Sequence, residues 1–359
     1  MSDDDPSPLG SGSEGSDTDN APTPYGKQGY WDDRYGTWAQ DPFDWLFSYK
    51  HLAHIIGAFF DHKERLLIPG CGNAPFSPDL YEAGYTTQVN IDTSTVVIGQ
   101  QIERHKDKMG CVWEVGDCMA MDHESESFDS AIDKSLVDTL MCAPDSAQCV
   151  HGFLSDMSRC VKPGGFIMLL SLHGKDELLE CIMPEHAEKP NSFADCDGTD
   201  SPFNWTVSSI EAPNPNRDPE SSAVYTIAIC RKHDPSRGFT GGARQQVALQ
   251  AALEECVAIP QRTMSKLLSG ISACTKAKLI THDEKADIKE LLLKYETIND
   301  FCRMSEHIHD LVITRKEKRA LEGDPSDFDY DGQFHVESGD FFKCAAVRAL
   351  DLLLAEDEE

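Results

Sequence analysis

The sequence contains few basic residues for its size. Lysine and arginine number 32 against 62 aspartates and glutamates, which gives a formal net charge of −30. A charge of this size repels nucleic acid phosphates and attracts basic partners, so we expect no nucleic acid substrate and favour a basic protein. Much of the acidity lies in the terminal segments, however, and acidic tails often serve only solubility.

The chain also lacks the features of a membrane or secreted protein. No apolar run approaches the ~20 residues of a membrane span, and Met1–Pro6 has neither the basic start nor the apolar core of a signal peptide. The 13 cysteines are an odd number without a Cys-x-x-Cys pair, which favours reduced thiols in the cytosol. The histidines show no metal-ligand spacing with one another or with the cysteines. We therefore expect a cytoplasmic protein that binds neither membrane nor metal.

A glycine turn after an apolar run is the first sign of a ligand site. The run that starts at Arg65 breaks at Gly70-Cys71-Gly72, and glycine suits a turn where the backbone approaches a nucleotide-like cofactor because it has no Cβ. The third glycine of the dinucleotide fingerprint is replaced by Pro75, and no Tyr-x-x-x-Lys pair occurs, which disfavours a nicotinamide dehydrogenase. Taken alone, the turn also fits an ordinary strand end.

Acidic residues follow three of the predicted strands. These strands cover 87–91, 111–116 and 128–132, and the residues directly after them are Asp92, Asp117 and Asp133. The carboxyl ends of parallel strands share one edge of a sheet, which is where open α/β sheets bind ligands. Asp92 stands where a carboxylate accepts ribose hydroxyls, and Asp117 where one accepts from an adenine amino group. A helix cap and a polar turn are the ordinary alternatives.

Later strands complete the predicted sheet. A strand over 166–170 follows a Pro-Gly-Gly turn, and the last two, over 204–207 and 223–229, flank a polar loop. Helical patterns alternate with the earlier strands and cover 76–83, 96–108 and 147–161. The expected fold is α/β, with seven strands of which the last two form a hairpin.

Several longer motifs resemble those of the class I S-adenosylmethionine-dependent methyltransferases. They are Tyr30–Tyr35, Asp44–Leu46, Gly70–Asn73, Asn90–Val97, Ser127–Asp129 and Asp133–Leu140. Within this class they look most like the eukaryotic group that methylates lysine in translation elongation factor 1-alpha. The resemblance spans roughly residues 25–234 and implies a Rossmann-like, doubly wound, mostly parallel seven-stranded sheet that binds S-adenosyl-L-methionine.

The resemblance also implies roles for the matching residues. In the family pattern Trp31 and Tyr35 close over the cofactor, Gly70 and Gly72 approach its methionine portion, Asp92 with Thr93 holds the ribose, Asp117 with Cys118 holds the adenine, and Lys134 lies beside the methyl-transfer pocket. Two positions of the expected site depart from the family. Phe43 stands where a tyrosine is frequent, and Ser135 stands where glycine is usual. Neither change removes a residue on which methyl transfer obviously depends.

Asp133 is the residue that we expect to act on the acceptor. The sulfonium methyl group is already activated, so the protein mainly aligns an amine, excludes water and helps to remove a proton. Asp133 ends the strand nearest to the expected methyl group, and we predict that it orients or deprotonates a lysine. A helix cap is an equally frequent role for such a residue. Trp45 is assigned to the core, because the apolar residues from Phe43 to Leu52 follow helical spacing.

The leading hypothesis is a protein-lysine N-methyltransferase acting on elongation factor 1-alpha or a similar basic protein. A methyltransferase for a small-molecule acceptor is the alternative enzyme. The absence of an Asn-Pro-Pro-Tyr segment disfavours planar amides and adenine amino groups as acceptors. The non-enzyme alternative is a catalytically inactive methyltransferase fold that serves as a binding module, with Phe43 and Ser135 as its signs.

The chain divides into three parts by composition. Residues 1–24 are rich in Ser, Gly, Asp and Pro and are expected to form a disordered acidic tail, and residues 25–234 form the predicted methyltransferase domain. Residues 235–359 are predicted to be a mainly helical module, with a capping box at Thr281–Glu284, an acidic loop over 324–340 and an apolar face over 342–353. This module has no recognisable catalytic constellation, which favours packing or partner binding. The pattern does not determine an oligomeric state.

Overall fold

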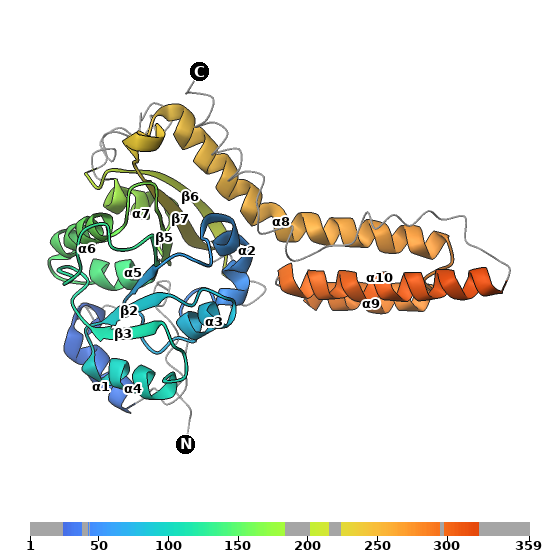
Figure 1. The fold of residues 1–359 in the computed structure, drawn as a ribbon, viewed down its shortest axis with the longest axis horizontal. Coiled ribbons are helices and arrows are strands. Elements are labelled where there is room, and N and C mark those ends of the chain that lie inside the picture. The colour runs from blue at the N-terminus through green and yellow to red at the C-terminus, as the bar shows by residue number, and fades with distance from the viewer. Residues whose placement is uncertain are drawn as a thin grey trace, which may run out of the picture.

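A mixed seven-stranded sheet lies within the globular part of the molecule, away from the projecting C-terminal helices (Figure 1). The computed structural model describes residues 24–37, 42, 44–183, 202–214, 224–294 and 298–322. The strands are β1 (Leu66–Pro69), β2 (Gln88–Asp92), β3 (Cys111–Val115), β4 (Ser130–Lys134), β5 (Phe166–Ser171), β6 (Trp205–Pro213) and β7 (Val224–Lys232). Their order is β3-β2-β1-β4-β5-β7-β6, with β1 to β5 parallel and β7 antiparallel to both neighbours. The predicted fold class is confirmed.

Helices surround this sheet and continue beyond it. The N-terminal segment contains the 3-10 helix η1 (Pro24–Gly26) and α1 (Gln28–Thr37). Helix α2 (Tyr49–Phe59) precedes β1, and the helices between strands are α3 (Phe76–Glu82), α4 (Thr95–Arg104), α5 (Leu136–Met141), α6 (Ser146–Cys160) and α7 (Lys175–Ile182). The C-terminal region contains η3 (Pro235–Arg237), α8 (Ala243–Lys276), α9 (His282–Lys294) and α10 (Ile298–Leu321). The helices predicted over 76–83, 96–108 and 147–161 correspond to α3, α4 and α6.

Successive residues of each strand point to opposite faces of the sheet. In β1, Leu66 and Ile68 belong to a core cluster that includes side chains of α2, α3 and α8. Leu67 belongs to a second cluster, which includes side chains of α6 and α7. All three side chains are buried. Strands buried on both faces are continuous apolar runs, which is why their positions could be predicted from the sequence.

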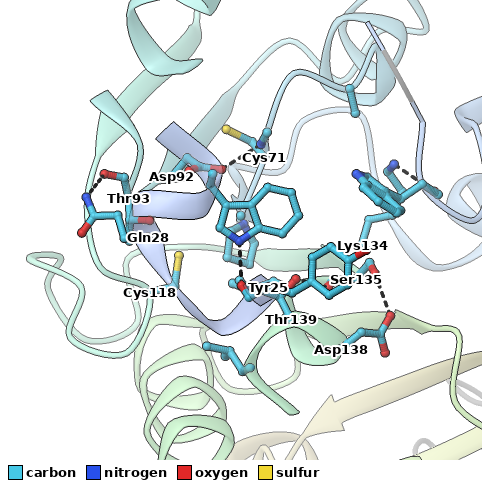
Figure 2. Close-up of a pocket in the computed structure, with 18 of the residues that line it drawn as sticks. Tyr25, Gln28, Cys71, Asp92, Thr93, Cys118, Lys134, Ser135, Asp138 and Thr139 are labelled. Atoms are coloured by element: carbon cyan, nitrogen blue, oxygen red, sulfur yellow. Dashed lines mark hydrogen bonds between the residues drawn. The ribbon is translucent and has the colours of Figure 1, made fainter. Parts of the chain in front are cut away.

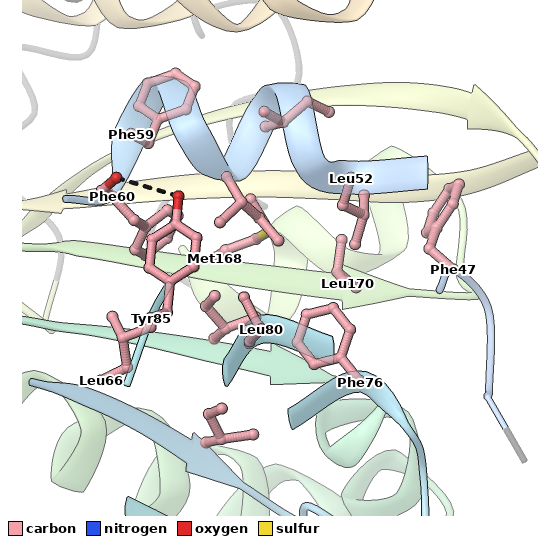
Figure 3. Close-up of a cluster of buried hydrophobic side chains, with 14 of the residues drawn as sticks. Phe47, Leu52, Phe59, Phe60, Leu66, Phe76, Leu80, Tyr85, Met168 and Leu170 are labelled. Atoms are coloured by element: carbon pink, nitrogen blue, oxygen red, sulfur yellow. Dashed lines mark hydrogen bonds between the residues drawn. The ribbon is translucent and has the colours of Figure 1, made fainter. Parts of the chain in front are cut away.

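The cluster beneath α2 is rich in aromatic side chains (Figure 3). Phe47 and Phe59 pack from opposite ends of the α2 region, and the hydroxyl of Tyr85 reaches the carbonyl of Phe60 at 3.5 Å. The helix begins only at Tyr49. The helical spacing predicted from Phe43 onwards is therefore wrong for the residues from 44 to 48.

Helix α8 covers the outer edge of the sheet at β6. The side-chain amide of Gln250 accepts the N–H of Ser209 and donates to its carbonyl, both at 3.2 Å. Gln246 donates to the carbonyl of Val207. These amides take the place of a neighbouring strand at an otherwise open edge. Because Leu253 of α8 belongs to the core of the sheet, the first half of this helix packs with the part of the chain predicted to end at residue 234.

Beyond the sheet, α8 runs outward and packs with α9 and α10 (Figure 1). A separate apolar cluster there contains Ile271, Ile288 and Ile308 from the three helices. The predicted capping box is confirmed, because the N–H of Thr281 donates to the Glu284 carboxylate at 2.8 Å and the N–H of Glu284 donates to the Thr281 hydroxyl at 3.2 Å.

Some of the predicted features lie outside the described residues. They are the tail up to residue 23, Phe43, the acidic loop over 324–340 and the apolar face over 342–353. Among the helices of the described ranges, none is long and apolar enough to cross a membrane. The cysteines whose side chains the structure describes are free thiols, and no group of three or more His, Cys, Asp or Glu among the described residues could hold a metal ion.

Candidate functional site

A cavity of about 260 Å³ lies at the carboxyl ends of β1, β2 and β4 (Figure 2). Its walls come from η1 and α1, the glycine turn after β1, the residues after β2 and β3, and the start of α5. The sequence-predicted site residues among its walls are Trp31, Tyr35, Gly70, Gly72, Asp92, Thr93, Asp117, Cys118 and Lys134. The structure thus brings together every predicted cofactor-site residue that it describes.

The glycine turn depends on left-handed backbone conformations. Gly70 has φ of +59° and Gly72 has φ of +54°, a region that other residues enter at a cost. The N–H of Cys71 donates to the carbonyl of Ile91 at 3.0 Å and ties the turn to β2. A Cβ added at Gly72 would lie 2.8 Å from the hydroxyl oxygen of Tyr35. The side chain of Tyr35 therefore closes over a turn that leaves no room for a larger residue.

Asp92 is the last residue of β2 and is buried. One carboxylate oxygen accepts the N–H of Gly72 and the other accepts the N–H of Ser94, both at 3.0 Å. Burial raises the pKa of Asp92, while these two N–H donors oppose the shift. A carboxylate has about four acceptor positions, so Asp92 can fix the turn and still accept hydroxyls of a ligand in the cavity.

Aromatic rings from two segments form one side of the cavity. Trp31 stacks on Tyr35 with centroids 5.9 Å apart, and it meets Trp45 edge to face at 6.3 Å. The indole N–H of Trp31 donates to the carbonyl of Tyr25 at 2.7 Å. Trp45 packs against the core, as the sequence predicted, but it also lines the cavity.

Gln28 belongs to the same wall and was not predicted from the sequence. Its amide donates to the carbonyl of Thr93 at 2.9 Å (Figure 2), which joins α1 to the end of β2. Gln28, Trp31 and Tyr35 are spaced i, i+3 and i+7, so they share one face of α1. That spacing was the signal by which Gln28 could have been found.

Asp117 and Cys118 form the wall after β3. Asp117 is exposed, and its carboxylate accepts the N–H of Met119 at 2.9 Å, as a polar turn requires. Cys118 is buried, and burial raises the pKa of its thiol well above the usual range. The pair therefore offers one charged acceptor beside a neutral, polarisable surface.

Lys134 links β4 to the segment before α2. Its ammonium group donates to the Asp44 carboxylate at 3.0 Å and to the carbonyl of Trp45 at 3.1 Å. Only 7% of the Lys134 side chain is exposed. Burial lowers the pKa of Lys134, and the charge of Asp44 opposes that shift. The hydrogen bonds of Lys134 therefore fix the backbone of Trp45 at the cavity wall.

Asp133 does not reach the cavity. It is fully buried, and its two carboxylate oxygens accept the N–H groups of Leu136 and Val137 at 2.9 and 3.2 Å. Burial, reinforced by the charge of Asp138, raises the pKa of Asp133 to about 8. Its position corresponds to the helix cap that the sequence left as the alternative, and it gives no support to contact with an acceptor.

Asp138 and Ser135 occupy the cavity wall instead. The Ser135 hydroxyl donates to Asp138 at 2.7 Å (Figure 2), and the Ser171 hydroxyl donates to the other carboxylate oxygen. Both residues were part of a recognised motif, yet no role was assigned to Asp138. Its i, i+3 spacing from Ser135 in the first turn of α5 was the available signal.

Comparison with known families identifies this arrangement. A family model described as a methyltransferase domain matches residues 60–221, and these residues include the glycine turn and the three strand-end aspartates. The chain carries a class I methyltransferase domain. Its cofactor is S-adenosyl-L-methionine, as the sequence predicted.

Relatives of the methyltransferase domain include enzymes named for elongation factor 1-alpha. The mouse protein named EEF1A lysine methyltransferase 4 is 32% identical over 152 residues, which are 40% of this chain and 60% of that protein. The bovine protein named eEF1A lysine and N-terminal methyltransferase is 29% identical over 41% of this chain and 22% of its own length. The match thus covers less than two thirds of either relative. Among solved structures, the Bradyrhizobium japonicum N-methyltransferase NodS with S-adenosyl-L-homocysteine is 14% identical over 58% of this chain and 98% of its own, with a TM-score of 0.41.

Proposed function

We propose that this protein is an S-adenosyl-L-methionine-dependent protein-lysine N-methyltransferase, with elongation factor 1-alpha or a similar basic protein as substrate. The observation that carries the proposal is the cavity, where the glycine turn, the Asp92 carboxylate and three aromatic rings converge on one ligand-sized space.

The residues of the cavity fit the cofactor. Asp92 is the proposed acceptor for the ribose hydroxyls, with Thr93 beside it, and Asp117 with Cys118 is proposed to hold the adenine. Gly70 and Gly72 are proposed to lie against the methionine portion, in a turn whose left-handed conformation favours glycine. Trp31 and Tyr35 are proposed to cover the bound cofactor and to exclude water. We extend the same proposal to Phe43, on the family pattern alone.

The chemistry divides between cofactor and protein. When bound, S-adenosyl-L-methionine supplies a methyl group on a positively charged sulfur. The protein then has to bind and align an amine, keep water out and accept a proton. The ring of Trp45 can attract a cation through its π-electrons and already has the Arg34 guanidinium 5.3 Å from its centroid, while Lys134, paired with Asp44, holds the backbone carbonyl of Trp45. Asp133 is proposed to stabilise the start of α5 rather than to contact the amine.

The substrate assignment rests on relatives and on charge. Two relatives are named for lysine methylation of elongation factor 1-alpha, and the net charge of −30 attracts a basic protein. The same charge disfavours nucleic acid. A substrate of this kind, together with the reduced thiols expected from the sequence, supports a cytoplasmic location as part of the proposal.

Mass spectrometry of a methylation reaction tests the proposed function. The full chain would be incubated with S-adenosyl-L-methionine and with elongation factor 1-alpha made in bacteria, which is then digested and mapped. We expect additional 14-Da methyl increments on a lysine with wild-type protein and far fewer with Asp92→Asn at micromolar cofactor. Methyl groups on a residue other than lysine would contradict the acceptor assignment. No methylation of this factor, or of other basic proteins in an unmethylated extract, would contradict the lysine methyltransferase proposal.

A further inference from the structure

Asp138 is a buried carboxylate in the wall of the cavity that the cofactor assignment does not use. The residue is 1% exposed and lines the cavity from the first turn of α5. One oxygen accepts the hydroxyl of Ser171, and the other accepts the hydroxyl of Ser135 at 2.7 Å and the N–H of Leu172 at 3.2 Å. A carboxylate accepts about four hydrogen bonds, so these three donors leave room for one more.

The backbone at Ser135 is strained in a way that serves this carboxylate. Ser135 has φ of +74°, a left-handed conformation that costs a non-glycine residue about 1–2 kcal/mol. Strain of this kind persists at functional sites when the surrounding structure holds it. Here it turns the serine side chain toward Asp138, and both residues line the same cavity. Glycine would relieve the strain but would remove the hydroxyl.

We propose that Asp138, oriented by Ser135 and Ser171, is the group that binds the acceptor amine and takes its proton. The inference rests on the proposed function and extends it to a residue at the same site. In this step an N–H bond of the ammonium breaks, its electron pair remains on nitrogen, and the proton moves to a carboxylate oxygen of Asp138. Both groups are then neutral, and the amine has the lone pair that methyl transfer requires.

The surroundings of Asp138 favour such a transfer. Burial raises the pKa of Asp138, and the hydroxyls of Ser171 and Ser135 oppose that shift. Burial lowers the pKa of an amine that enters the cavity, so the two proton affinities approach each other. The charged or titratable neighbours of Asp138 are Asp133 in β4, His173 after β5 and Tyr225 in β7.

Amine binding is the direct test, because it does not require turnover. The probe is n-butylammonium, which reproduces the end of a lysine side chain, titrated into the full chain with and without S-adenosylhomocysteine and followed by NMR. Asp138→Asn is compared with wild type and with Asp122→Asn, a matched change at an exposed position. Calorimetry with S-adenosylhomocysteine is run on all three proteins.

We expect Asp138→Asn to weaken amine binding at least tenfold while S-adenosylhomocysteine binds within twofold of wild type. Equal amine binding in wild type and Asp138→Asn, or no amine binding by wild type under either condition, would overturn the inference. Failure of the wild-type protein to bind S-adenosylhomocysteine would instead count against the proposed function. Amine binding can still be measured in that case, in the titration without S-adenosylhomocysteine.

Two variants of Ser135 keep the inference testable if Asp138→Asn fails to fold. Ser135→Gly removes both the backbone strain and the hydroxyl, whereas Ser135→Ala removes only the hydroxyl. The alanine variant should therefore melt at a lower temperature than the glycine variant. Loss of the hydroxyl raises the pKa of Asp138, and the acidic midpoint of amine binding should shift to higher pH in both. The titrations use a His173→Gln background, so that the electrostatic effect of His173 on Asp138 is absent from every protein compared. An unshifted midpoint in both variants would overturn the inference.

Discussion

Glycine at position 72 is required by two separate features of the turn after β1. Its φ of +54° is left-handed, and an added Cβ would lie 2.8 Å from the Tyr35 hydroxyl. Gly238 provides a matched comparison, because its φ is +71° but nothing lies within 4 Å of an added Cβ. Gly238→Ala should lower the free energy of unfolding only by the cost of the left-handed conformation, about 1 kcal/mol.

Gly72→Ala should lose more than Gly238→Ala, about 2–4 kcal/mol in total, because the contact with Tyr35 adds to the strain. Denaturant unfolding measures both. Adding Tyr35→Phe to Gly72→Ala removes the crowded oxygen and should restore part of the difference. Equal losses at the two glycines would show that Tyr35 does not close over the turn.

The same scale shows which of the strand-end aspartates expected at the site line the cavity. Asp92 does, since a residue at the end of a parallel strand faces the ligand edge. Asp133 was expected there for the same reason, but β4 runs to Lys134. Asp133 therefore lies inside the strand rather than after it, and its carboxylate accepts N–H groups from the start of α5. A shift of strand end by two residues cannot be read from an apolar run.

At the scale of elements, the helices beyond the sheet are joined by an ion pair that depends on pH. Arg315 of α10 donates to both carboxylate oxygens of Glu284 in α9, at 2.8 and 2.5 Å. These bonds hold the pKa of Glu284 down to about 2. A depressed pKa means that the contribution to stability is present above the ordinary value of 4.5 and is lost as the pH falls toward 2.

The expected consequence is a pH-dependent difference between wild type and Glu284→Gln. The variant should melt at a lower temperature at pH 6, and the gap should close progressively between pH 4.5 and pH 2. Glu317→Gln, at an exposed position of α10, is the control and should show no such closing gap. Circular dichroism melts at several pH values measure this. A gap that stays constant with pH would mean that the ion pair does not stabilise the fold.

Elements were predictable from sequence where burial is two-sided and less so elsewhere. Strands β1, β2 and β5 are buried along their whole length, and their positions were found. β6 continues to Pro213, well past the predicted end at residue 207. The prediction ended too early because Ser208 and Ser209 are polar yet buried. Their pairing with β7 and the contact of Gln250 with Ser209 are tertiary features. Likewise, α8 continues through Pro260, where sequence alone indicates a helix break.

At the scale of the whole molecule, helix α8 belongs both to the sheet region and to the outer group of helices. The sheet carries the cavity, and its core includes the first half of α8, whereas the second half of α8 packs with α9 and α10 around a separate apolar cluster. We propose that the outer helices serve packing or partner binding, since the site residues assigned here all come from the sheet side. The charge of −30 belongs to the chain as a whole and favours basic partners.

Calorimetric titration of the full chain with S-adenosyl-L-methionine tests the central claim most directly. We predict saturable binding with a Kd on the order of micromolar, unchanged in Asp122→Asn. Asp92→Asn should bind about 100-fold more weakly, since each hydrogen bond to a charged group contributes about 1.5–3 kcal/mol, and circular dichroism should show that the variant is folded. Absence of binding by wild type at millimolar cofactor, or equal binding by a folded Asp92→Asn, would contradict the assignment of this cavity as the cofactor site.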